Sequence, residues 1–135
     1  MNIDGIISIS GKPGLFKVVS QATNRIIIED VETGKRKPAF STSKVISLAD
    51  ITIFGHIDDL SLGEVFQKIY DKEEGKVSKP HKTEPTELRE YFESIWEEYN
   101  DEEVKDHDIK KIFQWYNLLA KHNMLAPETA TDEEE

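Results

Sequence analysis

The first 57 residues contain short runs of β-branched and aromatic residues separated by Gly, Pro, Asn and Asp, a pattern typical of strands joined by tight turns. Strands are expected at residues 6–9, 15–19, 25–31, 37–40 and 45–48, with 51–54 as a candidate last strand. Alternation of apolar and polar positions within each run predicts the inward-facing side chains. The expected core residues are Ile7, Ile9, Phe16, Val18, Ile26, Ile28, Val45 and Leu48.

Strands this short and this closely spaced favour a small, strongly bent barrel over a large sandwich. The sequence therefore predicts an SH3-like β-barrel over residues 1–57. Pro38 lies within one of these strands and has no backbone N–H to donate to a neighbour. We expect the strand that contains Pro38 to lie at an edge of the sheet or at a bulge.

The hydrophobic pattern changes to a helical period after Gly55. Ser61 and Glu64 have the spacing of a capping box, which predicts that a helix begins there. Apolar residues recur through the next two turns at helical spacing, and the segment closes at Gly75. Residues 58–83 are thus predicted to form a connecting helix followed by a polar linker over 75–83.

Two further amphipathic segments predict a pair of helices. The first runs from about residue 84 to 99, with Thr83 as its N-cap and Pro85 in its first turn. The second begins at Asp106 or Asp108 and ends near His122. A short connection between them predicts an antiparallel helical hairpin over residues 84–125. Residues 126–135 lack an apolar anchor and are expected to be a disordered acidic tail, so the fold class expected for the whole chain is α+β.

Three segments of the chain carry a resemblance to a known group of proteins. They are residues 9–16 (ISGKPGLF), 27–30 (IIED) and 108–119 (DIKKIFQWYNLL). Together they resemble an uncharacterised family of small proteins from Bacteroidota, and the resemblance covers nearly the whole chain. It implies a small N-terminal domain followed by a helical segment. No activity, cofactor or site residue comes with it.

Composition and charge narrow the classes of function. The sequence has no cysteine, which excludes disulfides and thiolate sites and fits a cytoplasmic protein. It shows neither a signal-peptide pattern nor an apolar run long enough to span a bilayer, so no membrane association is expected. Residues 1–57 carry a net charge of +2 and residues 58–135 a net charge of −12. The acidic part repels phosphate backbones.

Residues suited to catalysis or metal binding are scattered. His56, His81, His107 and His122 lie in four different segments without metal-ligand spacing. The carboxylates around His107 could form a weak divalent-ion site, but the start of a solvated helix explains them better. The Gly11–Gly14 turn lacks the ending of a phosphate-binding P-loop. We therefore expect a protein that is not an enzyme and has no catalytic residue, cofactor or metal.

Two groups of residues are candidates for partner binding. One is the basic set on the predicted barrel, and the other is a pair in the last helix that widens its apolar surface beyond one stripe. The candidates are Lys12, Lys35, Arg36, Lys37, Trp115 and Leu118. The first hypothesis is a non-enzymatic protein-interaction module that binds a protein through the barrel edge or the helices. The alternative is an RNA- or ribosome-associated protein that acts through the basic hairpin.

Overall fold

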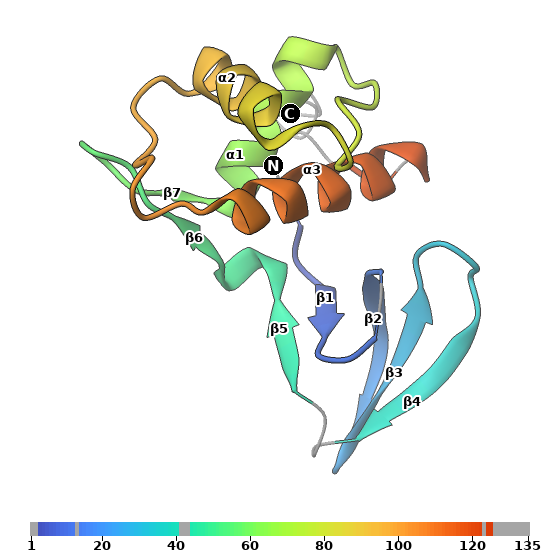
Figure 1. The fold of residues 1–135 in the computed structure, drawn as a ribbon. Coiled ribbons are helices and arrows are strands. Elements are labelled where there is room, and N and C mark those ends of the chain that lie inside the picture. Colours follow the sequence, from blue (N-terminus) through green and yellow to red (C-terminus); the bar gives the residue numbers. More distant parts are fainter. Residues whose placement is uncertain (1–2, 13, 41–43, 123, 126–135) are drawn as a thin grey trace, which may run out of the picture.

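The computed structural model describes residues 3–12, 14–40, 44–122 and 124–125. A bent β-sheet forms one part of the molecule and a group of helices lies against it (Figure 1). The predicted tail, residues 126–135, lies outside the described residues, as does Asn123. The described elements, in chain order, are β1 (Ile6–Ile9), β2 (Phe16–Ala22), β3 (Arg25–Asp30), β4 (Arg36–Phe40), β5 (Val45–Ser47), the 3-10 helix η1 (Leu48–Asp50), β6 (Thr52–Ile53), β7 (Leu60–Ser61), α1 (Leu62–Glu73), α2 (Pro85–Ile95) and α3 (Asp106–Lys121).

The larger sheet is antiparallel and has the strand order β4-β3-β2-β1-β5. The first four strands follow one another as hairpins, and β5 returns to pair with β1. Within the described residues no ladder joins β4 to β5, so the sheet is open and no closed barrel is found. The α+β class is confirmed, whereas the SH3-like barrel is not. The predicted edge position of Pro38 is confirmed, because Pro38 lies in β4, the last strand on one side.

The side chains of the sheet divide between two apolar clusters. Ile7, Ile9, Phe16, Ile28 and Ala39 are buried within the sheet itself, and Val18 and Ile26 pack partly buried against them. Leu48, the eighth position of the predicted core, is fully buried in the larger cluster, which the sheet shares with the helices. The period-two pattern therefore identified most of the sheet core.

The prediction for Val45 was wrong, because its side chain is 39% exposed. Val45 lies on the same face as Ile9, its partner in β1. However, β5 is the last strand of the sheet on that side, so no strand within the described part of the chain covers Val45 from outside. Val45 therefore leaves apolar surface exposed at the edge of the sheet.

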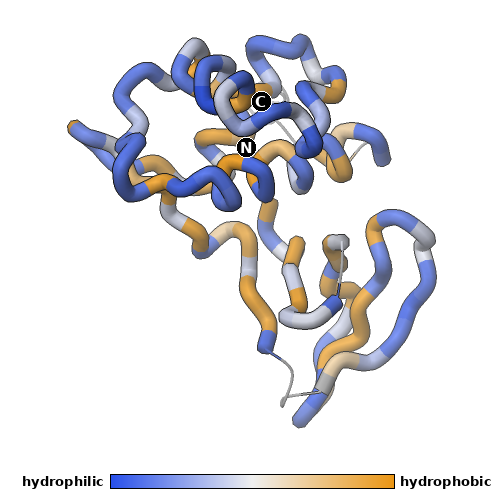
Figure 2. The backbone as a smooth tube through the Cα atoms, in the orientation of Figure 1, coloured by the Kyte–Doolittle hydropathy of each residue, from blue (hydrophilic) through white to orange (hydrophobic). Residues whose placement is uncertain are grey.

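The larger cluster joins the sheet to all of the described helices. Ile3, Ile6, Leu15, Val31 and Leu48 from the sheet half are buried together with apolar residues of α1, α2 and α3. The helical segment thus packs on the sheet and shares one core with it. Figure 2 shows the same arrangement, with hydrophobic stretches of the helices turned toward one another and hydrophilic stretches outside. As expected, α2 and α3 pack through aromatic rings, since Phe113 contacts Tyr91 and Phe92 at centroid distances of 5.9 and 6.3 Å.

The first helix begins where the capping box predicted. Glu64 N donates to Ser61 Oγ across 3.2 Å, and Ser61 N donates to Glu64 Oε2 across 2.8 Å. The helix ends at Glu73, and both Glu74 (φ 55°) and Gly75 (φ 83°) adopt the left-handed conformation that stops helices. The capping prediction is confirmed at both the residue and the hydrogen-bond level.

The segment after α1 is polar, as expected, and it is held against α3 by specific hydrogen bonds. Ser78 N donates to Asn117 Oδ1 across 2.6 Å, and Asn117 Nδ2 donates to Lys79 O across 2.8 Å. Tyr116 Oη donates to Lys76 O across 2.9 Å. Residues 76–79 therefore form a fixed strap along α3.

The second helix ends earlier than its sequence pattern predicted. It stops at Ile95 instead of about residue 99, and its N-cap is Glu84 instead of Thr83. Residues 96–100 instead run beside residues 54–56: His56 N donates to Glu98 O, and Asn100 N donates to Phe54 O. Trp96 and Tyr99 remain buried although they are outside the helix. Tertiary pairing has overridden a local helical pattern here.

The candidate last strand of the barrel belongs to a different unit. Thr52 and Ile53 form β6, which pairs antiparallel with β7 and not with the larger sheet. The connection from β5 passes through η1, which turns the chain away from the sheet and toward α1. Among the described helices, none combines the length and apolar character needed to cross a membrane.

Candidate functional site

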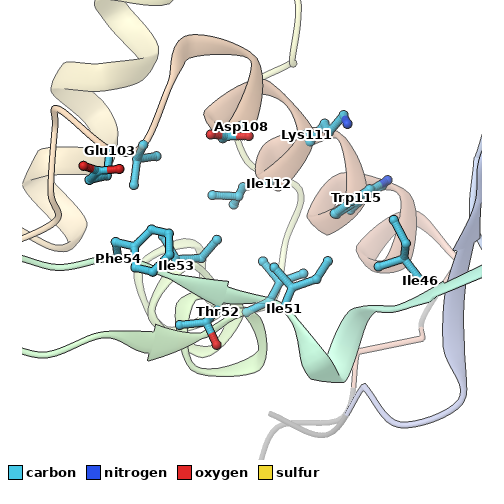
Figure 3. A pocket seen from close by; sticks show the side chains of 12 residues that line it. Ile46, Ile51, Thr52, Ile53, Phe54, Glu103, Asp108, Lys111, Ile112 and Trp115 are labelled. Carbon is cyan, nitrogen blue, oxygen red and sulfur yellow. The ribbon is translucent and has the colours of Figure 1, made fainter.

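An open groove of about 320 Å³ lies between α3 and the chain segment that leads from β5 to β6 (Figure 3). One wall comes from α3 and the preceding loop, and the other comes from residues 46–54. The lining residues are Ile46, Ile51, Thr52, Ile53, Phe54, Leu62, Glu103, Val104, Asp108, Lys111, Ile112 and Trp115. Most of these side chains are apolar, so the groove is suited to contact with apolar groups.

The groove has a buried floor and an exposed apolar rim. Leu62, Val104 and Ile112 are buried parts of the larger cluster. On the rim, Ile46 is 50% exposed and Phe54 is 49% exposed. Apolar side chains of this size that remain exposed beside an apolar hollow are typical of binding surfaces.

Three ionisable side chains lie around the groove. In Figure 3, Glu103 lies near Phe54 at one end, and Lys111 lies toward Trp115 and Ile46 at the other. Asp108 caps α3, because its Oδ2 accepts a hydrogen bond from Lys105 N across 3.0 Å. The groove is therefore acidic toward the Phe54 end and basic toward the Ile46 end.

The position of Phe54 is fixed by its neighbours. Gly55 forms a β-bridge with Tyr99, and His56 Nε2 lies 3.1 Å from Asp101 Oδ1. A side chain at Gly55 would force its surroundings to move, because its Cβ would lie 2.1 Å from Asp58 O and 2.7 Å from Trp96 Cζ2. The loop after β6 is thus pinned to the loop after α2, and Phe54 is held at the rim.

The structure places the two candidate residues of α3 in different hollows. Trp115 lines the groove beside residues 46–54, whereas Leu118 lines a second cavity of about 710 Å³ between α3, the strap and two turns of the sheet. Some polar groups of this second cavity are already used. Asp30 Oδ1 accepts from Glu32 N across 2.8 Å, and Asn117 holds the strap.

The basic candidates lie on turns and an edge strand of the sheet. Lys12 follows β1 and Lys35 lies in the turn before β4. Arg36 Nε is 3.0 Å from Glu29 Oε1, which makes an ion pair across β3 and β4. Lys37 Nζ lies 5.3 Å from the centroid of the Phe16 ring. Two of the four cations are therefore engaged with groups of the protein itself.

The histidine candidates are not brought together. His56 pairs with Asp101, and His107 Nε2 lies 3.2 Å from Asp108 Oδ1. Over the part of the chain that the structure describes, no group of three or more His, Asp or Glu side chains could hold a metal ion. The residues that sequence reasoning missed are Ile46 and Phe54, whose exposure follows from their place at a sheet edge and a pinned loop.

The chain is similar to proteins of unknown function. A family model described as a domain of unknown function (DUF5606) matches residues 3–48, and another (DUF6852) matches residues 51–119. A solution NMR structure of a protein from Bacteroides vulgatus is 38% identical, with a TM-score of 0.76, and the match covers 93% of this chain and 90% of that one. No curated protein matches the chain.

Proposed function

The chain belongs to an uncharacterised family, that of the domain of unknown function DUF6852, and we propose that it is a non-enzymatic protein-interaction module. Its proposed contact surface is the groove beside α3. The observation that carries this proposal is the exposure of Ile46 and Phe54, at 50% and 49%, on the rim of an apolar hollow. Covering them removes apolar surface from water, which is the main favourable term in most protein association.

The composition of the groove supports a protein partner. Trp115 and Phe54 provide aromatic surface, and aromatic residues are enriched at the centres of protein interfaces. Glu103, Asp108 and Lys111 provide a polar rim of mixed sign. An apolar centre with a charged border is the usual anatomy of such interfaces.

The sheet contributes a second part of this proposal. We read it as an incompletely closed SH3-like barrel, because it is a bent antiparallel meander in which β5 returns to β1. In this reading β4 and β5 are the open edges. The edge formed by β5 adjoins the groove through Ile46.

The alternative function is RNA or ribosome association through Lys12, Lys35, Arg36 and Lys37. Two observations weigh against it. Arg36 is paired with Glu29, and Lys37 lies over Phe16, so gripping phosphates would compete with contacts already made. The chain as a whole carries a net charge of −10, which opposes binding to a polyanion.

Affinity capture from native cells, quantified by mass spectrometry, tests the proposed function with two matched variants. Ile46→Lys places a charge at the groove rim, and Ile57→Lys places the same charge on an isoleucine that is 71% exposed outside the groove. Both positions are exposed, so both variants should fold. We expect the groove variant to lose specific partners about tenfold or more and the control to keep them. Equal recovery by the two variants would contradict the proposal.

Charge reversal in the basic hairpin distinguishes the RNA-binding alternative from the proposed function. The triple variant Lys35→Glu, Arg36→Glu and Lys37→Glu should leave protein capture intact. Titration with labelled single-stranded RNA at about 150 mM salt should show only weak binding by the unmodified protein. Tight binding that disappears in the triple variant and falls steeply with added salt would favour the RNA-binding function instead.

A further inference from the structure

We propose that the partner contributes an extended strand that pairs antiparallel with β5 and places apolar side chains over the groove. This inference rests on the proposed function and specifies its chemistry: the partner binds by main-chain pairing to an open sheet edge. The recognised segment has alternating apolar side chains, a basic N-terminal end and an acidic C-terminal end. The register of β5, the chemistry of the other edge and the charges of the groove each contribute to it.

The register of β5 leaves hydrogen-bonding groups on its outer side. Ser8 pairs with Ile46, and Ser10 N donates to Lys44 O across 2.9 Å. In an antiparallel ladder, alternate residues turn their N–H and C=O toward the partner strand. Residues 44 and 46 therefore face β1, and the N–H and C=O of Val45 and the N–H of Ser47 face the open edge.

The opposite edge of the sheet is unsuited to the same pairing. In β4, Pro38 lies opposite Ile27 and has no N–H, and the neighbouring positions Arg36 and Lys37 are charged. Proline and charged side chains at an edge strand discourage pairing with another chain. Figure 2 shows the contrast, since the start of β4 is hydrophilic whereas β5 is hydrophobic. Pairing is blocked at one edge and left open at the other.

The side chains of β5 favour being covered. Val45 and Ile46 are 39% and 50% exposed, which makes β5 an apolar strand at an edge that no other described strand pairs with. Such an edge is an aggregation hazard unless something covers it. Ile46 also lines the groove with Trp115, so a strand added beside β5 directs every second side chain over the same face.

The charges around the site set the order of charges along an antiparallel partner. The chain runs from Lys44 through β5 and on to Phe54, where Glu103 lies. An antiparallel partner begins near the Phe54 end, where Glu103 favours a basic residue. It ends near Lys44, and Lys111 lies toward the same end, which favours an acidic residue. The reverse order of charges places like charges together at both ends.

A random 12-residue peptide display library, selected on the full chain and counter-selected on Ile46→Lys, tests this recognition. We expect enriched peptides to alternate apolar and polar residues, with basic residues first and acidic residues last. A synthetic consensus peptide is then titrated into isotope-labelled protein and followed by NMR. The amide signals of Val45 and Ser47 should shift, and their exchange with solvent should slow. Failure to enrich such peptides, or the absence of these changes, would overturn the proposal.

Backbone methylation of the consensus peptide supplies a matched control. Alternate residues of the bound peptide turn their backbone N–H toward β5. Methylating these amide nitrogens removes hydrogen-bond donors and blocks close approach, so the affinity of the peptide should fall about tenfold or more. Methylating the amide nitrogens that point away from β5 should leave the affinity nearly unchanged. Equal affinities for the two peptides would overturn strand pairing. The proposed function would then still be decided separately, by cell capture with Ile46→Lys and Ile57→Lys.

Light scattering decides whether a second copy of the chain occupies the edge instead. We expect the unmodified protein to be monomeric at micromolar concentration. A dimer that dissociates in the Ile46→Lys variant would show that β5 pairs with itself and would overturn the assignment to a partner strand. The proposed function would then still be tested by the capture experiment.

Discussion

The phenol of Tyr116 donates a hydrogen bond to the backbone carbonyl of Lys76 across 2.9 Å and so ties α3 to the segment that follows α1. Tyr116 is fully buried, and its ring contacts Phe66 edge to face at a centroid distance of 6.0 Å. The residue therefore serves as core on one side and as an anchor for the strap on the other.

Replacing Tyr116 by Phe keeps the ring and removes only this hydrogen bond. We expect a loss of about 0.5–1.5 kcal/mol in the free energy of unfolding, because the carbonyl of Lys76 is left with a poorer partner. Urea denaturation measures this loss in the free energy of unfolding. Tyr70→Phe is a matched control in α1, because Tyr70 is half-buried and its hydroxyl makes no hydrogen bond to another described residue. A control that lost as much would contradict this account.

The same residue predicts a dependence on alkaline pH. Burial raises the pKa of the Tyr116 phenol above its ordinary value, and nearby Glu73 adds to the increase. Because the folded pKa is the higher one, the stabilisation is complete below about pH 10, where an unfolded tyrosine begins to ionise, and it is lost as pH rises further. The free energy of unfolding, measured from pH 8 to 11, should therefore fall more steeply with pH for the unmodified protein than for Tyr116→Phe. Parallel curves would refute the assignment.

Gly55→Ala tests the pinned loop that holds Phe54. The new Cβ would overlap Asp58 O and the Trp96 ring, so the loop must move, at a cost of about 1–3 kcal/mol or more. Gly5→Ala is the control, because Gly5 has a φ of 82° but no atom within 4 Å of an added Cβ. It reports conformational strain alone, about 1 kcal/mol. We expect thermal unfolding to show the larger loss at Gly55.

Arg89 organises the loop between α2 and α3, and Arg89→Lys should weaken it. Its guanidinium donates to Asp106 Oδ1 at 2.5 Å, to Val104 O at 2.9 Å, and to Asp101 O and Tyr99 Oη at 3.3 Å each. Lysine keeps the charge but cannot reproduce this fork. We expect a loss of about 1–3 kcal/mol by chemical denaturation.

A neighbouring position provides the comparison for Arg89. Glu90→Gln changes an exposed side chain on the same helix and should alter stability by less than about 0.5 kcal/mol. Hydrogen exchange adds a second readout, because the amide of Val104 should exchange faster in Arg89→Lys. If only global stability fell and this amide stayed protected, the loop assignment would be wrong.

Much of the fold follows from local sequence signals. The capping box at Ser61 and the alternation of Ile7 and Ile9 each act over a few residues, and each was found where predicted. The end of α2 could not be found in this way. Residues 96–100 continue a helical apolar stripe, but their backbone groups pair with residues 54–56, which lie far away in the sequence.

The groove was only partly predictable, for the same reason. Trp115 stood out because it widens the apolar surface of its helix, and it does line the groove. Ile46 looked like an ordinary strand residue, since nothing local shows that β5 is the last strand of its sheet. Edge positions depend on the strand order, and that order is set by contacts between distant parts of the chain.

The apolar cluster shared by the sheet and the helices has a consequence for how the molecule comes apart. The two family models meet between residues 48 and 51, yet Leu48, Ile6 and Leu15 are buried together with Phe66 and Phe113. Detaching either part exposes a large apolar surface on the other. Heating should therefore give one calorimetric transition, with the van't Hoff and calorimetric enthalpies equal. A gene cut at the family boundary should yield fragments that are insoluble when expressed alone and that recover structure when mixed.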